Sequence, residues 1–148
     1  MTVIDIYIKS DFVRKYRSIC EKYNDFNNRM RGDNILLYKK MFDKLNINYT
    51  YNKKESFFKL ENFIADYKFN LNLILKGGLV EALIYIETED DFLKPSGRFD
   101  FIAEQIDKEF DRKKYNLPKY CSEQELECIV EELLSLYQDL RTEFRNSA

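Results

Sequence analysis

Histidine and tryptophan are absent from this chain, and proline, glycine and cysteine are scarce, with two, four and three residues respectively. Without histidine, neither a Ser-His-Asp nor a Cys-His nucleophilic system can form, and zinc sites with histidine ligands are excluded. The few prolines and glycines are scattered, so the sequence contains no flexible linker or low-complexity segment. These absences remove most hydrolase mechanisms and favour a single domain over residues 1–148.

The three cysteines, at positions 20, 121 and 128, are odd in number and lack CxxC spacing. We therefore expect free thiols in a reducing compartment. No apolar run approaches the 18 or so residues of a membrane-spanning helix. The first residues have no basic segment and place Asp5 inside the apolar stretch, which is not typical of a secretory signal. Together these features predict a cytoplasmic protein.

Positively and negatively charged residues are unevenly distributed along the chain. Residues 1–78 carry 15 Lys and Arg against 9 Asp and Glu, whereas residues 79–148 carry 9 against 17. The overall net charge of −2 therefore conceals a basic first half and an acidic second half. An acidic half is suited to a basic partner, through long-range attraction and charge pairing.

Two helices are expected in the first third of the chain. Residues 3–8 alternate in hydropathy and predict either a short strand or the start of the following helix. From Asp11 onward apolar residues recur at steps of three and four, which predicts one helix as far as Met30. Its apolar stripe is Phe12, Tyr16, Ile19, Tyr23, Phe26 and Met30. A second stripe over residues 37–45 predicts a shorter helix, and we expect the two to pack as an αα-hairpin.

Two β-hairpins are predicted next. Residues 47–64 change period around the polar turn 52–55, which indicates a loose hairpin. Gly77-Gly78 supplies the positive φ angles of a two-residue turn, so residues whose numbers sum to 155 should pair. This register places Leu71 opposite Ile84 on one apolar face, which belongs to the core. The other face is mixed and half exposed; its apolar members include Ile74, Leu79, Leu83 and Tyr85.

Two helices are expected in the acidic half. Pro95-Ser96-Gly97 precedes a helix whose inward residues are Phe99, Ile102, Ala103, Ile106 and Phe110. Ser122-Glu-Gln-Glu125 is a capping box that opens a longer helix. That helix has the stripe Leu126, Ile129, Val130, Leu133, Tyr137, Leu140 and Phe144. The sequence therefore predicts an α+β fold, in which a central antiparallel sheet of about four strands packs with the N-terminal αα-hairpin and two C-terminal helices.

Three patterns are compatible with chemistry, but each has a simpler structural explanation. Three thiolates could bind a metal, although their spacing is wrong. Asp66-Tyr67-Lys68 resembles the end of a magnesium nuclease site, but Lys68 is placed opposite Glu87 across the hairpin. Residues 94–98 open a helix and could bind an anion, but an N-cap turn accounts for them better. We therefore expect no catalytic residue, no metal and no cofactor, and predict that the protein is not an enzyme.

Cations of the first half offer a nucleic-acid surface as an alternative, with Tyr7 or Tyr38 available for base stacking. They are Arg14, Lys15, Arg17, Lys22, Arg29, Arg31, Lys39 and Lys40. Acidic residues are interleaved with them and the isoelectric point is 5.4, which is typical of a solvated helix face. Nucleic acid is therefore the less favoured partner.

Acidic and aromatic residues lie together after the second hairpin. Carboxylates at 87 and 89–91 directly precede Phe92, a combination of charge and apolar anchor that is typical of protein interfaces. Further carboxylates are expected on the outward side of the next helix. The predicted partner-binding residues are Tyr85, Glu87, Glu89, Asp90, Asp91, Phe92, Asp100, Glu104 and Asp107. A homodimer through the half-exposed hairpin face is left open.

The size, the α+β layout, the absence of catalytic motifs and the acidic runs at 87–91 and 123–132 resemble those of small bacterial immunity proteins. These cytosolic proteins accompany polymorphic and contact-dependent-inhibition toxins. The resemblance is architectural, extends loosely over the whole chain and includes no diagnostic motif, so it transfers no contact residue. It implies stoichiometric binding to a toxin domain, often a nuclease with a basic cleft, which acidic side chains would block. The basic first half departs from this pattern.

Overall fold

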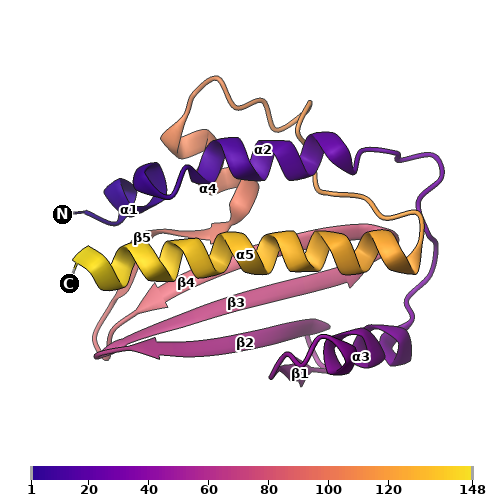
Figure 1. The fold of residues 1–148 in the computed structure, drawn as a ribbon, viewed down its shortest axis with the longest axis horizontal. Coiled ribbons are helices and arrows are strands. Elements are labelled where there is room, and N and C mark those ends of the chain that lie inside the picture. Colours follow the sequence, from indigo (N-terminus) through magenta and orange to yellow (C-terminus); the bar gives the residue numbers. More distant parts are fainter. Residues whose placement is uncertain (1, 148) are drawn as a thin grey trace.

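The computed structural model describes residues 2–147 and has a five-stranded antiparallel sheet at its centre, in the order β1-β2-β3-β4-β5 (Figure 1). The strands are β1 (Thr50–Asn52), β2 (Phe57–Ile64), β3 (Tyr67–Lys76), β4 (Leu79–Glu87) and β5 (Phe92–Arg98). Five helices accompany it in this part of the chain: α1 (Val3–Lys9), α2 (Phe12–Lys22), α3 (Ile35–Lys44), α4 (Phe99–Ile106) and α5 (Glu123–Ser147). The predicted α+β class is confirmed, with one strand more than expected.

The β3–β4 hairpin has the predicted register. Leu71 pairs with Ile84 and Phe69 with Ile86, and all four side chains are buried. Gly77 and Gly78 adopt the positive φ angles that the tight turn requires, 61° and 80°. The turn and the hydrophobic pattern specify the same pairing, because a slip of one residue would move the apolar set to the other face.

Helix α5 lies across the sheet and buries its apolar stripe against it (Figure 1). The Phe144 ring meets the Phe69 ring edge-on at 5.0 Å, and the Tyr137 hydroxyl lies 2.9 Å from the Asn62 side-chain oxygen. At the N-terminus of α5, the Ser122 hydroxyl accepts the Glu125 N–H at 3.1 Å, which is one half of the predicted capping box. The Glu125 carboxylate accepts the Cys121 N–H at 2.8 Å instead of the Ser122 N–H. Helix α2 lies beside α5 in the same layer (Figure 1).

The N-terminal segment forms neither the predicted strand nor the start of the following helix. Residues 3–9 are helical because Thr2 and Asp5 form a capping box, so the strand interpretation of residues 3–8 is wrong. Asp11 takes a left-handed conformation, with φ of 57°, and separates α1 from α2. Helix α2 ends at Lys22 rather than near Met30, and Phe26 is 51% exposed although its spacing continues the stripe.

Helices α2 and α3 do not form the predicted αα-hairpin. Helix α3 packs at the β1–β2 side of the sheet, whereas α2 lies beyond α5 (Figure 1). The Phe42 ring lies 4.8 Å from the Phe58 ring of β2, and the Tyr38 ring lies 6.2 Å from it. The buried rings of Phe42 and Phe58 explain this position, since α3 completes the core at the Phe58 end of β2 while α5 contacts the same strand at Asn62.

Residues 92–98 form an edge strand where a helix-opening turn was expected. Gly97 pairs with Ile84, and the register shifts between Ile84 and Ile86. Helix α4 starts at Phe99 as predicted but ends at Ile106 instead of reaching Phe110. The Asp107 carboxylate accepts the Glu109 N–H at 3.0 Å, a local bond that competes with continuing the helix.

Candidate partner-binding surface

The connection between β4 and β5 carries the acidic residues that the sequence singles out. Its backbone closes through a hydrogen bond of 2.8 Å from the Thr88 N–H to the Asp91 carbonyl. The Asp91 carboxylate accepts the Phe92 N–H at 2.7 Å. Glu89, Asp90 and Asp91 are all exposed, and across residues 2–147 none of the three takes part in an ion pair. We call residues 89–91 the acidic turn.

Two aromatic rings lie next to the acidic turn. Tyr85 points to the sheet face opposite α5, and its ring meets that of Phe92 edge-on, with centroids 6.3 Å apart. Phe92 is 53% exposed, and it differs from other exposed apolar residues such as Phe63 and Leu36 in lying directly beside three exposed carboxylates and a second ring. The two rings border a hollow of about 280 Å³, completed by Lys94, Pro95, Ser96 and Gln105. We call it the aromatic hollow.

Glu87 belongs to the sheet rather than to the acidic turn. Its carboxylate lies 3.7 Å from the Lys68 ammonium and accepts the Asn70 side-chain amide at 3.4 Å. Lys68 is also 3.6 Å from Glu61, so the charges form a ladder across three strands. This pairing leaves Glu87 half-buried and partly neutralised.

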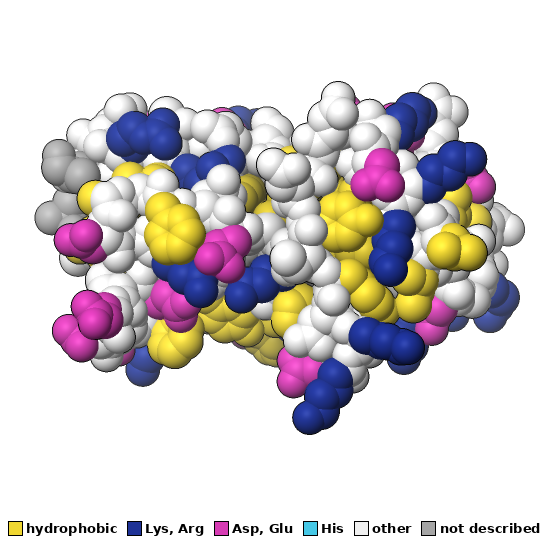
Figure 2. All heavy atoms as spheres, turned by 90° about the horizontal axis from the view of Figure 1, so that it is seen from below, with side chains coloured by type: hydrophobic (Ala, Val, Ile, Leu, Met, Phe, Trp, Pro, Cys, Tyr) yellow, Lys and Arg dark blue, Asp and Glu magenta, His cyan; other side chains and the backbone are white. Residues whose placement is uncertain are grey.

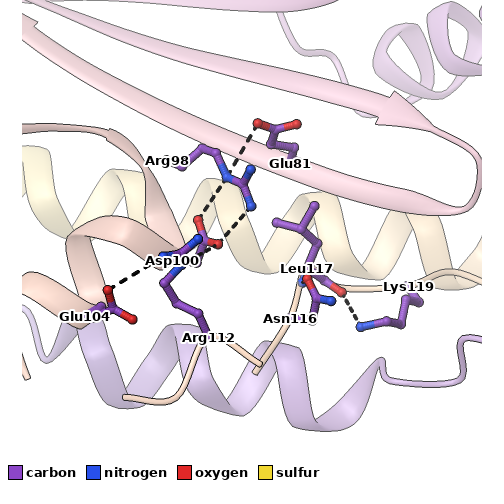
Figure 3. Close-up of polar contacts among 8 residues, drawn as sticks. All are labelled: Glu81, Arg98, Asp100, Glu104, Arg112, Asn116, Leu117 and Lys119. Atoms are coloured by element: carbon purple, nitrogen blue, oxygen red, sulfur yellow. Dashed lines mark hydrogen bonds and ion pairs between the residues drawn. The ribbon is translucent and has the colours of Figure 1, made fainter. Parts of the chain in front are cut away.

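Asp100 lies apart from the predicted surface, in a buried ion network (Figure 3). Only 2% of the residue is exposed. Arg98 donates to both carboxylate oxygens, at 3.0 and 2.8 Å, and Arg112 lies 3.5 Å away. Glu81 on β4 pairs with Arg98 at 3.5 Å. Burial is the largest influence on the pKa of Arg98 and lowers it, but the hydrogen bonds to Asp100 and the negative charges of Asp100 and Glu81 together outweigh burial and raise the pKa.

Glu104 and Asp107 are likewise occupied within the molecule. Glu104 forms the exposed end of the same network, 3.6 Å from Arg112. Asp107 pairs with Arg17 of α2 at 3.2 Å. Of the predicted residues, the structure therefore brings together Tyr85, Phe92 and the acidic turn, with Glu87 at their border, and places the three carboxylates of α4 and its C-terminus elsewhere.

The two halves of the chain pair their charges with each other. Five ion pairs join a cation of residues 1–78 to a carboxylate of residues 79–148: Lys15–Asp139, Arg17–Asp107, Lys22–Glu132, Lys44–Glu127 and Lys68–Glu87. The pairs to α5 and to Asp107 use four of the acidic-half carboxylates. Part of the charge asymmetry is thus satisfied internally. Among residues 2–147, the other carboxylates of the acidic half that make no ion pair are Glu109, Asp111, Glu123, Glu125, Glu131 and Glu143. What distinguishes the acidic turn is that its three unpaired carboxylates are consecutive and lie beside an exposed ring.

Figure 2 views the molecule from the side of β2 and α3. Lysines and arginines are interspersed there with carboxylates and with exposed apolar side chains, and neither sign forms a continuous field. Mixed charge of this kind is typical of a solvated surface. It gives a nucleic-acid interface little support on this face.

The other chemical candidates remain scattered. Asp66 is exposed in the β2–β3 turn, and the three cysteines are free thiols. Burial raises the pKa of the Cys20 thiol to about 12, which disfavours the reactive thiolate. Between Thr2 and Ser147, no three histidine, cysteine or carboxylate side chains gather in a metal-binding arrangement.

Sequence reasoning missed the other walls of the aromatic hollow and the exposed ring of Phe101. Phe101 is flanked by the guanidinium groups of Arg98 and Arg112, which lie 4.8 and 3.8 Å from its centroid. The helical phase of α4, with Phe99 and Ile102 inward, was a signal that Phe101 points outward. For Lys94 and Gln105 no such signal existed, because β5 and α4 meet only through tertiary folding.

No known protein family, curated protein or solved structure matches this chain. Within the described residues, no helix combines the length and apolar character needed to cross a bilayer. The inference of function therefore rests on the surface itself.

Proposed function

We propose that this protein is a cytoplasmic immunity protein, which binds a cognate toxin domain and neutralises it by steric and electrostatic blocking. The observation that supports this best is the acidic turn: three consecutive exposed carboxylates without an ion pair, beside a ring that is 53% exposed. Charged rims around aromatic anchors are the usual anatomy of a protein–protein interface.

The unpaired charges are placed to act at long range. Carboxylates that are already paired contribute little field, whereas the acidic turn projects three negative charges from one end of the sheet. Such a patch accelerates encounter with a basic surface, and association then slows as salt screens the attraction. The aromatic side chains act after encounter, since burying Phe92 and Tyr85 slows dissociation. In a nuclease toxin, the same carboxylates would occupy the place of substrate phosphates.

A nucleic-acid-binding or nuclease-accessory role for the basic helices is the second candidate, and the ion pairs of α2 argue against it in that helix. Lys15, Arg17 and Lys22 each hold a carboxylate of the acidic half, so their charge is largely neutralised. Phosphate binding by these groups would require the pairs to open. This neutralisation does not extend to four other cations of the first half, which make no ion pair among residues 2–147: Arg29, Arg31, Lys39 and Lys40.

The test is affinity capture from a lysate of the native host, at low and moderate salt, with bound proteins and nucleic acids both identified. A captured basic protein is then expressed in a heterologous host with and without this chain. We expect it to inhibit growth alone and to be neutralised by stoichiometric co-expression. Recovery of nucleic acid alone, or capture of a protein whose toxicity this chain does not relieve, would contradict the proposal.

A further inference from the structure

The side chains that line the aromatic hollow are mainly apolar, whereas the acidic turn beside it is negatively charged. This contrast restricts the kind of side chain that can bind in the hollow. Tyr85, Phe92 and Pro95 supply apolar walls, and Lys94 is the one cationic side chain among the lining residues. Immediately outside, the acidic turn is exposed and unpaired. A partner must therefore meet an aromatic, weakly cationic interior and an anionic edge within a few residues of chain.

The size of the hollow argues for a side chain rather than a metabolite. Small-molecule sites usually have volumes of about 300–1,000 Å³ and enclose most of their ligand. The hollow, at about 280 Å³, is at the lower limit of this range, and it lies open at the surface beside partly exposed aromatic rings, so it would enclose little of a metabolite. A single large side chain from another protein fills such a space, as interface anchors commonly do.

The charges select which side chain this is. A lysine or arginine inside the hollow would meet the Lys94 ammonium, whereas an aromatic ring would attract it through a cation–π contact. An aromatic ring also packs edge-to-face against Tyr85 and Phe92. Outside the hollow the preference reverses, because Glu89, Asp90 and Asp91 attract cationic residues.

We propose that the aromatic hollow receives an aromatic anchor residue, and that this residue lies in a basic loop of the protein partner, with lysines or arginines on either side. The inference rests on the proposed function and deepens it, because it specifies the chemistry of the segment that docks. It identifies Lys94 as a contact residue alongside Tyr85 and Phe92, whereas Gln105 borders the hollow and limits its size without contributing to the binding energy.

The absence of tryptophan from the chain makes the test direct, because a tryptophan-containing probe fluoresces against a tyrosine-only background. The first probe is the pentapeptide Lys-Arg-Trp-Arg-Lys, blocked at both ends, whose tryptophan emission reports binding. For affinities, dye-labelled forms of this peptide and of the control peptide Lys-Arg-Ala-Arg-Lys are compared. We expect the tryptophan peptide to bind with a blue-shifted emission and the alanine peptide to bind about tenfold more weakly. Equal affinity of the two labelled peptides, or no binding of either at millimolar concentration, would overturn the inference.

A matched pair of variants locates the binding. Gln105→Tyr places a larger side chain at the exposed helical wall of the hollow, while Gln105→Ala opens it. We expect the first to weaken tryptophan-peptide binding about tenfold and the second to leave it within about twofold. Circular dichroism confirms that both are folded. Unchanged binding by Gln105→Tyr would place the peptide elsewhere. The proposed function is tested separately, since toxin neutralisation that survives in Gln105→Tyr would refute the anchor while leaving the immunity role standing.

Discussion

Arg98 holds the buried carboxylate of Asp100 with two hydrogen bonds, at 3.0 and 2.8 Å, although only one residue separates them in sequence. The pair links β5 to α4, and Arg112 joins it from the segment that follows α4. Removing the carboxylate would leave two guanidinium groups without their shared anion. Asp100 is therefore a structural residue in this conformation.

We expect Asp100→Asn to lower the free energy of unfolding by about 3 kcal/mol, because Arg98 and Arg112 lose the buried anion that they share. Among residues 2–147, the ion pairs that remain to the two arginines are the longer ones with Glu81 and Glu104. The control is Glu104→Gln, at the exposed end of the same network, which should cost less than about 1 kcal/mol. Urea unfolding of both variants checks the difference. A small and equal loss in the two would show that the network contributes little to stability.

The β3–β4 turn offers a second comparison, between adjacent glycines with similar φ angles. A Cβ atom on Gly77 would meet nothing within 4 Å, whereas one on Gly78 would lie 2.5 Å from the Met30 carbonyl oxygen. Gly78 is also fixed by its carbonyl, which accepts the Tyr120 N–H at 2.9 Å. The segment around Met30 thus packs directly on the turn.

Gly77→Ala should cost about 1–2 kcal/mol, which is the strain of a left-handed alanine. Gly78→Ala should cost about 1–3 kcal/mol more, because backbone must also move. Thermal or urea unfolding measures both. If the two variants are equally stable, the segment around Met30 yields without cost and the close contact does not constrain the turn.

The elements that the sequence predicts well are those in which two local signals agree. The β3–β4 register follows from both the glycine turn and the alternation, and α5 has both a capping-box sequence and a continuous stripe. A signal that stands alone is less dependable: the stripe over residues 37–45 does mark helix α3, but two other single signals fail. Residues 3–8 alternate like a strand, but the Thr2–Asp5 cap and packing make them helical, and Phe26 continues a helical spacing outside any helix.

The candidate binding surface was predictable only in part, for a related reason. The acidic turn and Phe92 are adjacent in sequence, so their proximity required no tertiary information. Asp100 looked similar, but whether a carboxylate is free depends on distant cations, and Arg112 reaches it only through the fold. Strand β5 escaped prediction because Pro95 and Gly97 weaken a strand signal, although an edge strand tolerates both.

Alkaline pH should destabilise the protein partly through Cys20. Burial raises the pKa of this thiol from about 9 to about 12 in the folded state. The unfolded chain therefore releases the proton first, so stability is intact below pH 9 and falls by about 1.4 kcal/mol per pH unit between 9 and 12. Buried tyrosines such as Tyr7 and Tyr16, whose pKa values burial also raises, add to the loss above pH 10.

Cys20→Ala isolates the thiol contribution. The free energy of unfolding of the variant and of the wild type is measured from pH 8 to pH 11. At pH 8 the variant should be the less stable of the two, because a buried side chain is truncated. Its free energy of unfolding should then decline less steeply between pH 9 and 11. Parallel pH profiles for the two proteins would mean that Cys20 does not ionise differently in the folded and unfolded states.

Neutralising the acidic turn should separate binding from stability. The variant Glu89→Gln, Asp90→Asn, Asp91→Asn removes three charges that make no ion pair, and the asparagine at 91 keeps an oxygen for the Phe92 N–H. We expect its unfolding free energy to stay within about 0.5 kcal/mol of the wild type.

The matched control is Glu109→Gln, Glu123→Gln, Glu131→Gln, which changes three other exposed carboxylates and shifts the net charge from −2 to +1 equally. Surface plasmon resonance at increasing salt measures the rate of association with the captured basic partner. The acidic-turn variant should associate more slowly and with less dependence on salt, whereas the control variant should be much less affected. An equal effect of the two would mean that overall charge, rather than the acidic turn, guides the encounter, and the turn would then lose its assignment as the binding site.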